Sequence, residues 1–233
     1  MTIEVQPVLV ADLRRCAEIE QQAFAESPLN NVLFPGARAE DGLGSRTDDL
    51  TKELREDPTV RMFKAVDTDL EGDQAIVGWS KWDVHESGMP APKDRVSPPS
   101  ANDEAYRMMF VGLDQMRERL MGGKPCVCKC STTRQMAYSS CHLTLDEDLH
   151  ILVVDPKHQR RGVGVQMMTW GMQEAVRLGV PVYLESSVSG HRLYQKVGFK
   201  DVEERRVDFS KFGMAAPHSN WAMIWELPNK RCP

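Results

Sequence analysis

Residues 158–168 (HQRRGVGVQMM) combine positive charge, glycine and the start of an amphipathic stretch. They follow an apolar run that must stop pairing at Pro156, because proline has no N–H for a strand ladder. Gly162 and Gly164 lack a Cβ, so a ligand can approach the main chain closely there. A helix beginning at this point offers free N–H groups and the positive end of its dipole. The stretch therefore predicts an anion site suited to phosphate, with the neighbouring arginines adding charge-assisted hydrogen bonds.

Two common phosphate-binding motifs fit this stretch poorly. The P-loop ends in Gly-Lys-Ser/Thr, and no such ending follows the glycines. The dinucleotide fingerprint requires a third glycine where Met167 stands, and it opens the first strand–helix unit of its domain. This stretch lies about two thirds along the chain. A protein that binds ATP or NAD through the same turn therefore stays as a weaker alternative.

A third motif fits the stretch well. Residues 159–164 (QRRGVG) match Gln/Arg-x-x-Gly-x-Gly/Ala and resemble the pyrophosphate-binding motif of the GNAT superfamily of N-acetyltransferases. About 30 residues later, residues 193–199 (LYQKVGF) resemble the Leu-Tyr-x-Lys-x-Gly-Phe segment of that family. The firm resemblance covers residues 149–199, in a style similar to fungal members, and elsewhere only the order of elements matches. It implies a GNAT-like α/β (mixed α+β) fold, with a mixed, mostly antiparallel central sheet of about six to seven strands, splayed at the central strands and flanked by helices.

The resemblance implies that acetyl-CoA is the co-substrate. Main-chain N–H groups of the glycine turn are expected to hold its diphosphate. The strand over residues 152–154 is expected to pair with the pantetheine amides and to direct one N–H at the thioester oxygen. The cofactor-binding residues implied in this way are Leu152, Val153, Val154, Gln159, Arg160, Arg161, Gly162, Val163, Gly164, Val165, Tyr194 and Lys196.

Acetyl transfer from a thioester to an amine also needs an acid for the departing thiolate and a base for the acceptor ammonium. The resemblance makes Tyr194 the candidate acid, although a core aromatic on a short helix is the alternative. Asp148 and Glu185 are the candidate bases. Asp148 aligns with the catalytic glutamate of histone-acetylating members, but a solvated acid in a turn is the somewhat more typical interpretation of its position. His150 is a further option, more typical of a structural histidine, and some members use water chains instead.

Strands and helices alternate along the chain, as required to position these residues. Apolar periodicity after Asp12 predicts a helix that follows a strand at residues 3–8. Further strands are predicted at 60–67, 75–84, 149–154, 180–187, 202–209 and 220–227, and helices at 103–121, 162–178 and within 189–199. The proline-rich stretch between about residues 84 and 102 predicts a loop. We therefore expect one domain over residues 1–233, with an insertion at about 84–141.

Composition narrows the class of partners. The formal net charge of −5 does not favour nucleic acid, and no apolar run approaches a membrane span. The N-terminus is not typical of a secretory signal, so we expect a cytoplasmic protein with reduced thiols. The group of Cys126, Cys128, Cys130 and Cys141, with His142, lacks the Cys-x-x-Cys pairs of zinc sites. We expect no metal there and interpret the segment as a surface excursion.

The sequence thus predicts an acetyl-CoA-dependent N-acetyltransferase that moves the acetyl group directly to a primary amine of a small molecule or peptide. No cysteine lies beside a recognisable base, so a covalent acetyl-enzyme is not favoured. The alternative is a non-catalytic acyl-CoA-binding module of the same fold. A monomer or homodimer, without nucleic-acid or membrane partners, is expected, and no residue pattern specifies the acceptor amine.

Overall fold

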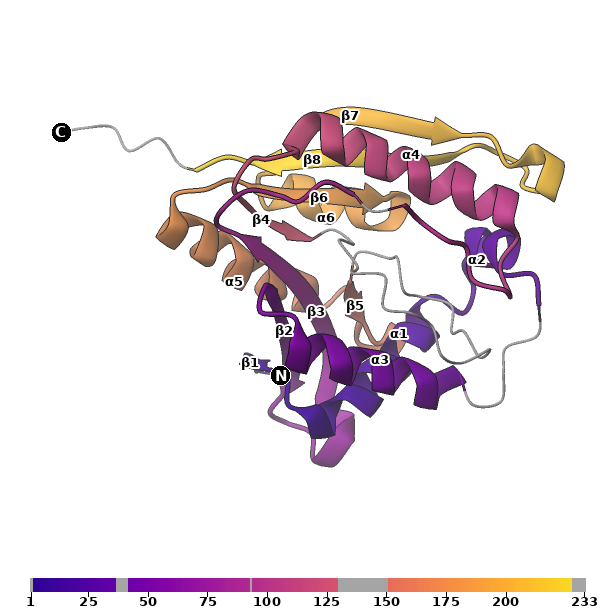
Figure 1. The fold of residues 1–233 in the computed structure, drawn as a ribbon. Coiled ribbons are helices and arrows are strands. Elements are labelled where there is room, and N and C mark those ends of the chain that lie inside the picture. Colours follow the sequence, from indigo (N-terminus) through magenta and orange to yellow (C-terminus); the bar gives the residue numbers. More distant parts are fainter. Residues whose placement is uncertain (1, 37–41, 93, 130–150, 228–233) are drawn as a thin grey trace.

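The computed structural model describes residues 2–36, 42–92, 94–129 and 151–227 (Figure 1). The helices are α1 (Leu13–Ala23), α2 (Pro28–Leu33), α3 (Gly42–Glu56), α4 (Asp103–Met121), α5 (Val163–Leu178) and α6 (Val188–Lys196). The strands are β1 (Ile3–Pro7), β2 (Val60–Asp67), β3 (Ile76–His85), β4 (Cys126–Lys129), β5 (Leu152–Val154), β6 (Val182–Ser187), β7 (Lys200–Val207) and β8 (His218–Trp225). Single 3₁₀ turns lie at Val10–Asp12, Gly72–Ala75, Pro156–His158 and Ser210–Phe212.

The eight strands form one sheet in the order β1-β2-β3-β4-β6-β8-β7, and β5 pairs with β3 beside this path. The β4–β6 pair is parallel, and the other described pairs are antiparallel. This confirms the mixed, mostly antiparallel sheet that the sequence predicts. The sheet has one strand more than the upper end of that prediction because β4 was not expected.

Strand β4 corrects the interpretation of the cysteine segment. Cys126 and Cys128 are 0% exposed and pack against α4, whereas Val127 between them packs on the other face. An alternation of small apolar side chains at the centre of a sheet fills both layers at once. The prediction of a surface excursion is therefore wrong for these residues. The other members of the group, Cys130, Cys141 and His142, lie outside the described residues.

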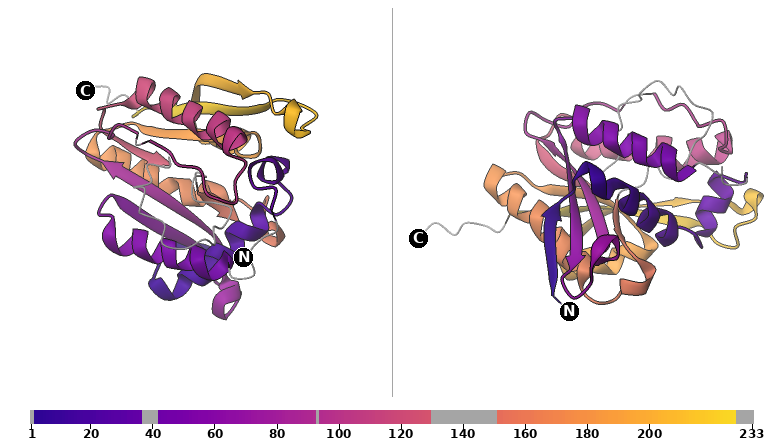
Figure 2. Two further views of the ribbon diagram at one scale, coloured as in Figure 1. Left: turned by 45° about the vertical axis from the view of Figure 1, so that its right-hand side comes forward. Right: turned by 90° about the horizontal axis from the view of Figure 1, so that it is seen from below.

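Helices cover both faces of the sheet (Figure 2). On one face α1 and α3 pack on β2, β3 and β5, and α2 and α4 pack on β4, β6 and β8. On the other face α5 and α6 pack on the centre of the sheet. Helix α5 approaches so closely that a Cβ on Gly171 would lie 2.3 Å from the Trp82 ring. The two helices that carry the predicted motifs are therefore held on the same face.

Strands β4 and β5 lie end to end along one edge of β3, whose other edge is taken by β2. Asp83 pairs with Cys128, so Lys129 comes opposite Trp82. At the next position, the Lys81 N–H donates to the carbonyl of residue 151 at 2.9 Å. Residues 129 and 151 therefore occupy consecutive places on the edge of β3, and the alternation between the two faces continues from one to the other.

This register predicts that a variant lacking residues 130–150 folds normally. Joining Lys129 to Ile151 would give one continuous strand in the present register. The entropy of closing the chain between two fixed positions depends only weakly on the number of residues between them, so we expect a free energy of unfolding within about 2 kcal/mol of the wild type. Urea unfolding followed by circular dichroism measures it.

The matched control removes one residue more, 130–151. That deletion turns every β5 side chain to the opposite face, and we expect a loss of several kcal/mol or no cooperative unfolding, on the order of repeated core-packing defects. Equal stability of the two deletion variants would contradict the continuous register.

Candidate active site at the splayed strands

The sheet opens between β5 and β6. Within the described ranges, β5 pairs only with β3. Strand β6 pairs with β4 as far as Leu184, and its remaining residues pair only with β8 among the residues described. The Ile151 carbonyl accepts from the Lys81 N–H of β3, and the Asp155 N–H donates to the Val77 carbonyl of β3. Main-chain groups of alternate residues in a strand point to the same side. The main-chain groups of Val153 therefore face β3, whereas those of Leu152 and Val154 face the opening.

The turn after β5 is anchored by Asp155, which is 3% exposed. One carboxylate oxygen accepts from the Lys157 N–H at 2.9 Å, and the other accepts from the Arg15 guanidinium on α1 at 2.6 Å. Burial alone would raise the pKa of Asp155, but these hydrogen bonds and the positive charge of Arg15 outweigh it and lower the pKa. The start of the glycine-rich stretch is thus fixed to both the sheet and α1.

We expect Asp155→Ala to cost about 3–5 kcal/mol of unfolding free energy at pH 7, because it leaves the Arg15 charge buried without its partner. A carboxylate with a lowered pKa stabilises the fold above its ordinary pKa of 3.8, and the contribution disappears as the pH falls through the lower folded-state value. The difference between variant and wild type should therefore shrink below that pH. Urea unfolding from pH 7 to pH 3 measures this.

The double variant Asp155→Ala/Arg15→Met is the control for this pair. An apolar side chain removes the stranded charge, so the double variant should recover much of the lost stability. A single variant as stable as the wild type would show that the ion pair does not anchor the turn.

The turn between Gln159 and α5 has a backbone conformation that exposes its N–H groups. Gly162 has φ +87°, a left-handed value that glycine adopts without strain, and Arg160 has φ +63°. Within the described residues, the N–H groups of residues 160–164 donate no hydrogen bond. The Val165 N–H instead donates to the Gly162 carbonyl at 3.1 Å. The free donors therefore end one residue earlier than the sequence predicts.

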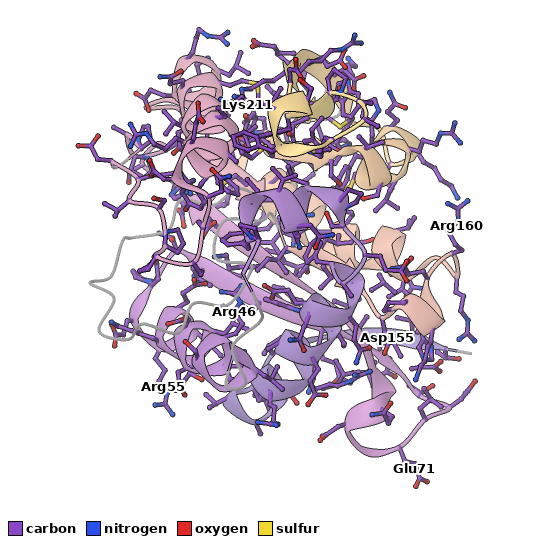
Figure 3. All side chains as sticks on the ribbon, turned by 90° about the vertical axis from the view of Figure 1, so that its right-hand side faces the viewer. Arg46, Arg55, Glu71, Asp155, Arg160 and Lys211 are labelled. Carbon is purple, nitrogen blue, oxygen red and sulfur yellow. The ribbon has the colours of Figure 1, made fainter. Side chains whose placement is uncertain are left out.

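The side chains of the turn divide into supporting and outward-facing groups. The Gln159 amide donates to the Val154 carbonyl at 3.1 Å, which ties the turn back to the end of β5. Arg161 lies 3.0 Å from His158 Nδ1. Arg160 projects outward from the edge of the molecule (Figure 3). An anion at the exposed N–H groups would therefore meet two exposed arginines, while Gln159 supports the backbone.

Gly164 connects this turn to the second motif. A Cβ on it would lie 3.1 Å from Leu193 on α6 and 3.4 Å from Leu152 on β5. Val163 beside it is 1% exposed and packs with Met167. The second glycine of the motif thus allows close helix packing, and the first provides the left-handed turn.

Tyr194 lies in α6 on the α5 side of the sheet, and it is 6% exposed. Its ring meets Phe199 edge-on at 5.9 Å between centroids. Burial raises its pKa above the ordinary value of 10.0, so the phenol keeps its proton at neutral pH. The Lys129 side-chain nitrogen lies 2.5 Å from the Tyr194 hydroxyl oxygen. Sequence reasoning missed this lysine because it belongs to a strand that was not predicted.

The structure does not bring the candidate base Glu185 to Tyr194. Glu185 on β6 lies on the opposite face of the sheet, where it accepts from the Tyr183 hydroxyl at 2.9 Å and faces Arg117 Nε at 4.0 Å. Asp148, like His150, lies outside the described residues. Lys196 is exposed on α6, in the same helix as Tyr194. The roles of all four stay predictions.

In the described part of the chain, no group of three or more His, Cys, Asp or Glu side chains is arranged to hold a metal ion. None of the helices found in the same residues combines the length and apolarity needed to cross a bilayer.

Comparison with known proteins gives a sequence match over this site. Residues 126–201 match the family model described as an acetyltransferase (GNAT) domain. A 70-residue stretch is 39% identical to "Probable acyltransferase SID5" of Ajellomyces capsulatus. This match spans 30% of the chain and 47% of that relative, about half of its length. The family match begins at the first residue of β4, in agreement with the place of that strand in the sheet.

Solved structures extend the likeness to the whole fold. Histone acetyltransferase HPA2 and related acetyltransferase from Corynebacterium glutamicum superimposes with a TM-score of 0.55 at 17% identity, over 98% of this chain and 99% of that one. NAA60 of Arabidopsis thaliana, solved with a bisubstrate analogue, gives 0.54 at 13% identity over 96% and 97%. The acetyltransferase yncA of Salmonella typhimurium, solved with acetyl-CoA, gives 0.53 at 13% identity over 100% and 98%. Because the sequence identities to these structures are low, the structural similarity establishes the fold alone.

Proposed function

Because this chain belongs to the GNAT superfamily of acetyltransferases, we propose that it transfers the acetyl group of acetyl-CoA directly to a primary amine of a small molecule or peptide. Acetyl-CoA supplies the acetyl group as an activated thioester. The observation that carries the proposal is the run of free N–H groups at residues 160–164, beside an opening in the sheet that Tyr194 adjoins. A diphosphate and a thioester arm need these two features next to each other.

The residues of the opening have distinct roles in this proposal. The N–H groups of residues 160–164 bind the diphosphate, with Arg160 and Arg161 adding charge. The outward main-chain groups of Leu152 and Val154 hold the pantetheine amides, as an added strand would, and Val153 is left out because its main chain faces β3. Tyr194 keeps a proton for the leaving sulfur.

Thiol release from acetyl-CoA in the presence of a panel of amines tests this function. The panel includes peptide N-termini, lysine side chains, polyamines and aromatic amines, since the structure does not favour one of them. We expect thiol release that depends on at least one amine. Tight binding of CoA with no thiol release from any amine would instead establish the non-catalytic acyl-CoA-binding module.

A thermal-shift comparison of CoA, ATP and NAD tests the identity of the ligand. A ligand that binds only the folded state raises the melting temperature as its concentration increases. We expect a concentration-dependent rise with CoA. A larger rise with ATP or NAD than with CoA would contradict the proposed co-substrate.

A further inference from the structure

Lys129 is buried at the point where the sheet opens. It is 1% exposed, it is the last residue of β4, and its amine lies 2.5 Å from the Tyr194 hydroxyl and 4.8 Å from the centre of that ring. Among the described residues, no carboxylate lies within ion-pair distance of this amine. The other deeply buried lysine, Lys81, is paired with Glu53 at 2.9 Å. A lysine buried against a phenol, with no carboxylate partner in the described part of the chain, is poorly placed for stability alone.

The surroundings of Lys129 favour its neutral form. Burial lowers the pKa of its amine well below 10.5 and raises the pKa of Tyr194. Lys129 pairs in register with Leu184, so it faces α5 and α6, whereas Asp83 and Glu185 alternate to the opposite face. The ionisable side chains of α5 and α6 other than Tyr194 pair elsewhere or are exposed: Glu174, Arg177, His191, Arg192 and Lys196. A neutral Lys129 amine can therefore donate an N–H to the Tyr194 hydroxyl oxygen and keep its lone pair free.

We infer that Lys129 is the general base of the acetyl transfer and that it works as a pair with Tyr194. The inference deepens the proposed function and depends on it. The inference is based on the direct hydrogen bond between the Lys129 and Tyr194 side chains, on the α5 side of the opening. Of the candidate bases from the sequence, Glu185 is engaged on the far face, and Asp148 lies outside the described residues.

Lys129 and Tyr194 together can carry a proton from the acceptor amine to the leaving thiolate. The Lys129 amine takes a proton from the acceptor ammonium, which frees the lone pair of the acceptor nitrogen. That nitrogen bonds to the acetyl carbon, and the bond between carbon and sulfur breaks. The sulfur takes the proton of Tyr194, and the Lys129 ammonium returns a proton to the tyrosine oxygen. The acceptor nitrogen loses two protons on becoming an amide: one has then moved to the thiol, the second is released to water, and both side chains are restored.

The kinetic test uses Lys129→Met and Lys129→Arg. Methionine keeps the length without a base, and arginine keeps a basic side chain that does not lose its proton in proteins. We expect both to lower kcat about 100-fold or more, with the KM for acetyl-CoA nearly unchanged. The acidic limb of the wild-type profile of kcat/KM against pH should disappear. Lys52→Met, which alters an exposed lysine of α3, should leave both unchanged.

A second test does not depend on activity. In protein labelled with ¹³C at lysine, the Lys129 resonance, identified by its loss in Lys129→Met, should titrate below the exposed lysines. Titration together with the exposed lysines would overturn the inference.

The outcomes separate this inference from the proposed function. A wild type that releases thiol, with Lys129→Met or Lys129→Arg retaining its kcat and acidic limb, would overturn the role of Lys129 and leave the function standing. A wild type that is inactive with every amine would overturn both. Loss of acetyl-CoA binding in Lys129→Met would show a structural role and would also overturn the inference.

Discussion

Replacing Tyr194 by phenylalanine should lower kcat for acetyl transfer about 100-fold or more and leave the KM for acetyl-CoA nearly unchanged. The phenol is buried beside the opening, and its raised pKa keeps the proton available for a departing thiolate. Phenylalanine preserves the edge-on packing with Phe199 and removes only the hydroxyl. Steady-state kinetics with acetyl-CoA and the best acceptor amine measure both parameters.

Tyr106→Phe is the matched control for this prediction. Tyr106 is 4% exposed in α4, on the other face of the sheet, so the same chemical change there should leave kcat within about twofold. If Tyr194→Phe retained its kcat while Tyr106→Phe behaved as expected, Tyr194 would be a packing residue. A retained kcat in Tyr194→Phe would also contradict the proposed role of Lys129, because that role requires Tyr194 as the proton-donating partner.

Reversing both arginine charges of the turn, Arg160→Glu with Arg161→Glu, should raise the KM for acetyl-CoA about 100-fold or more. Two charge-assisted hydrogen bonds of about 1.5–3 kcal/mol each would be lost, and two negative charges would face the diphosphate. Both side chains are exposed, so the fold should persist. The increase in KM should be smaller at high salt, because exposed charges are screened.

Arg55→Glu serves as the control for charge reversal. Arg55 lies in α3, well away from Arg160 (Figure 3), so its reversal should leave the KM for acetyl-CoA nearly unchanged. An unchanged KM in the double variant would place the diphosphate away from this turn. A fall in kcat alone would point to a role of the arginines after cofactor binding.

The sequence predicted those elements of the fold that carry a strong local signal. The strands β1, β2, β3 and β8 and the helices α4 and α5 have clear apolar patterns, and Gly179 ends α5 in the left-handed conformation typical of a helix cap. Helix α3 was not predicted because three leucines are its only large apolar side chains. It is held by Leu50 and by a buried ion pair between Arg46 and Glu20 at 2.9 Å. A tertiary contact of this kind produces no periodic apolar pattern in the sequence, so the helix could not be predicted from it.

In the candidate site, too, the features set by local sequence could be predicted and the long-range contacts could not. Backbone features follow from local sequence, since the left-handed Gly162 and the start of α5 depend on residue type and spacing. Long-range pairs do not: the contact of Lys129 with Tyr194 joins residues 65 positions apart, and that of Arg15 with Asp155 joins residues 140 apart. Lys129 was further hidden because β4 has only four residues and pairs with distant strands. The topology of the sheet had to be known before either contact could be inferred.

A crystal structure of the chain with CoA tests the central claim most directly. We expect the diphosphate to accept hydrogen bonds from the main-chain N–H groups of residues 160–164, with the pantetheine arm between β5 and β6 and the sulfur beside Tyr194. CoA bound elsewhere, with these N–H groups facing only solvent, would contradict the account.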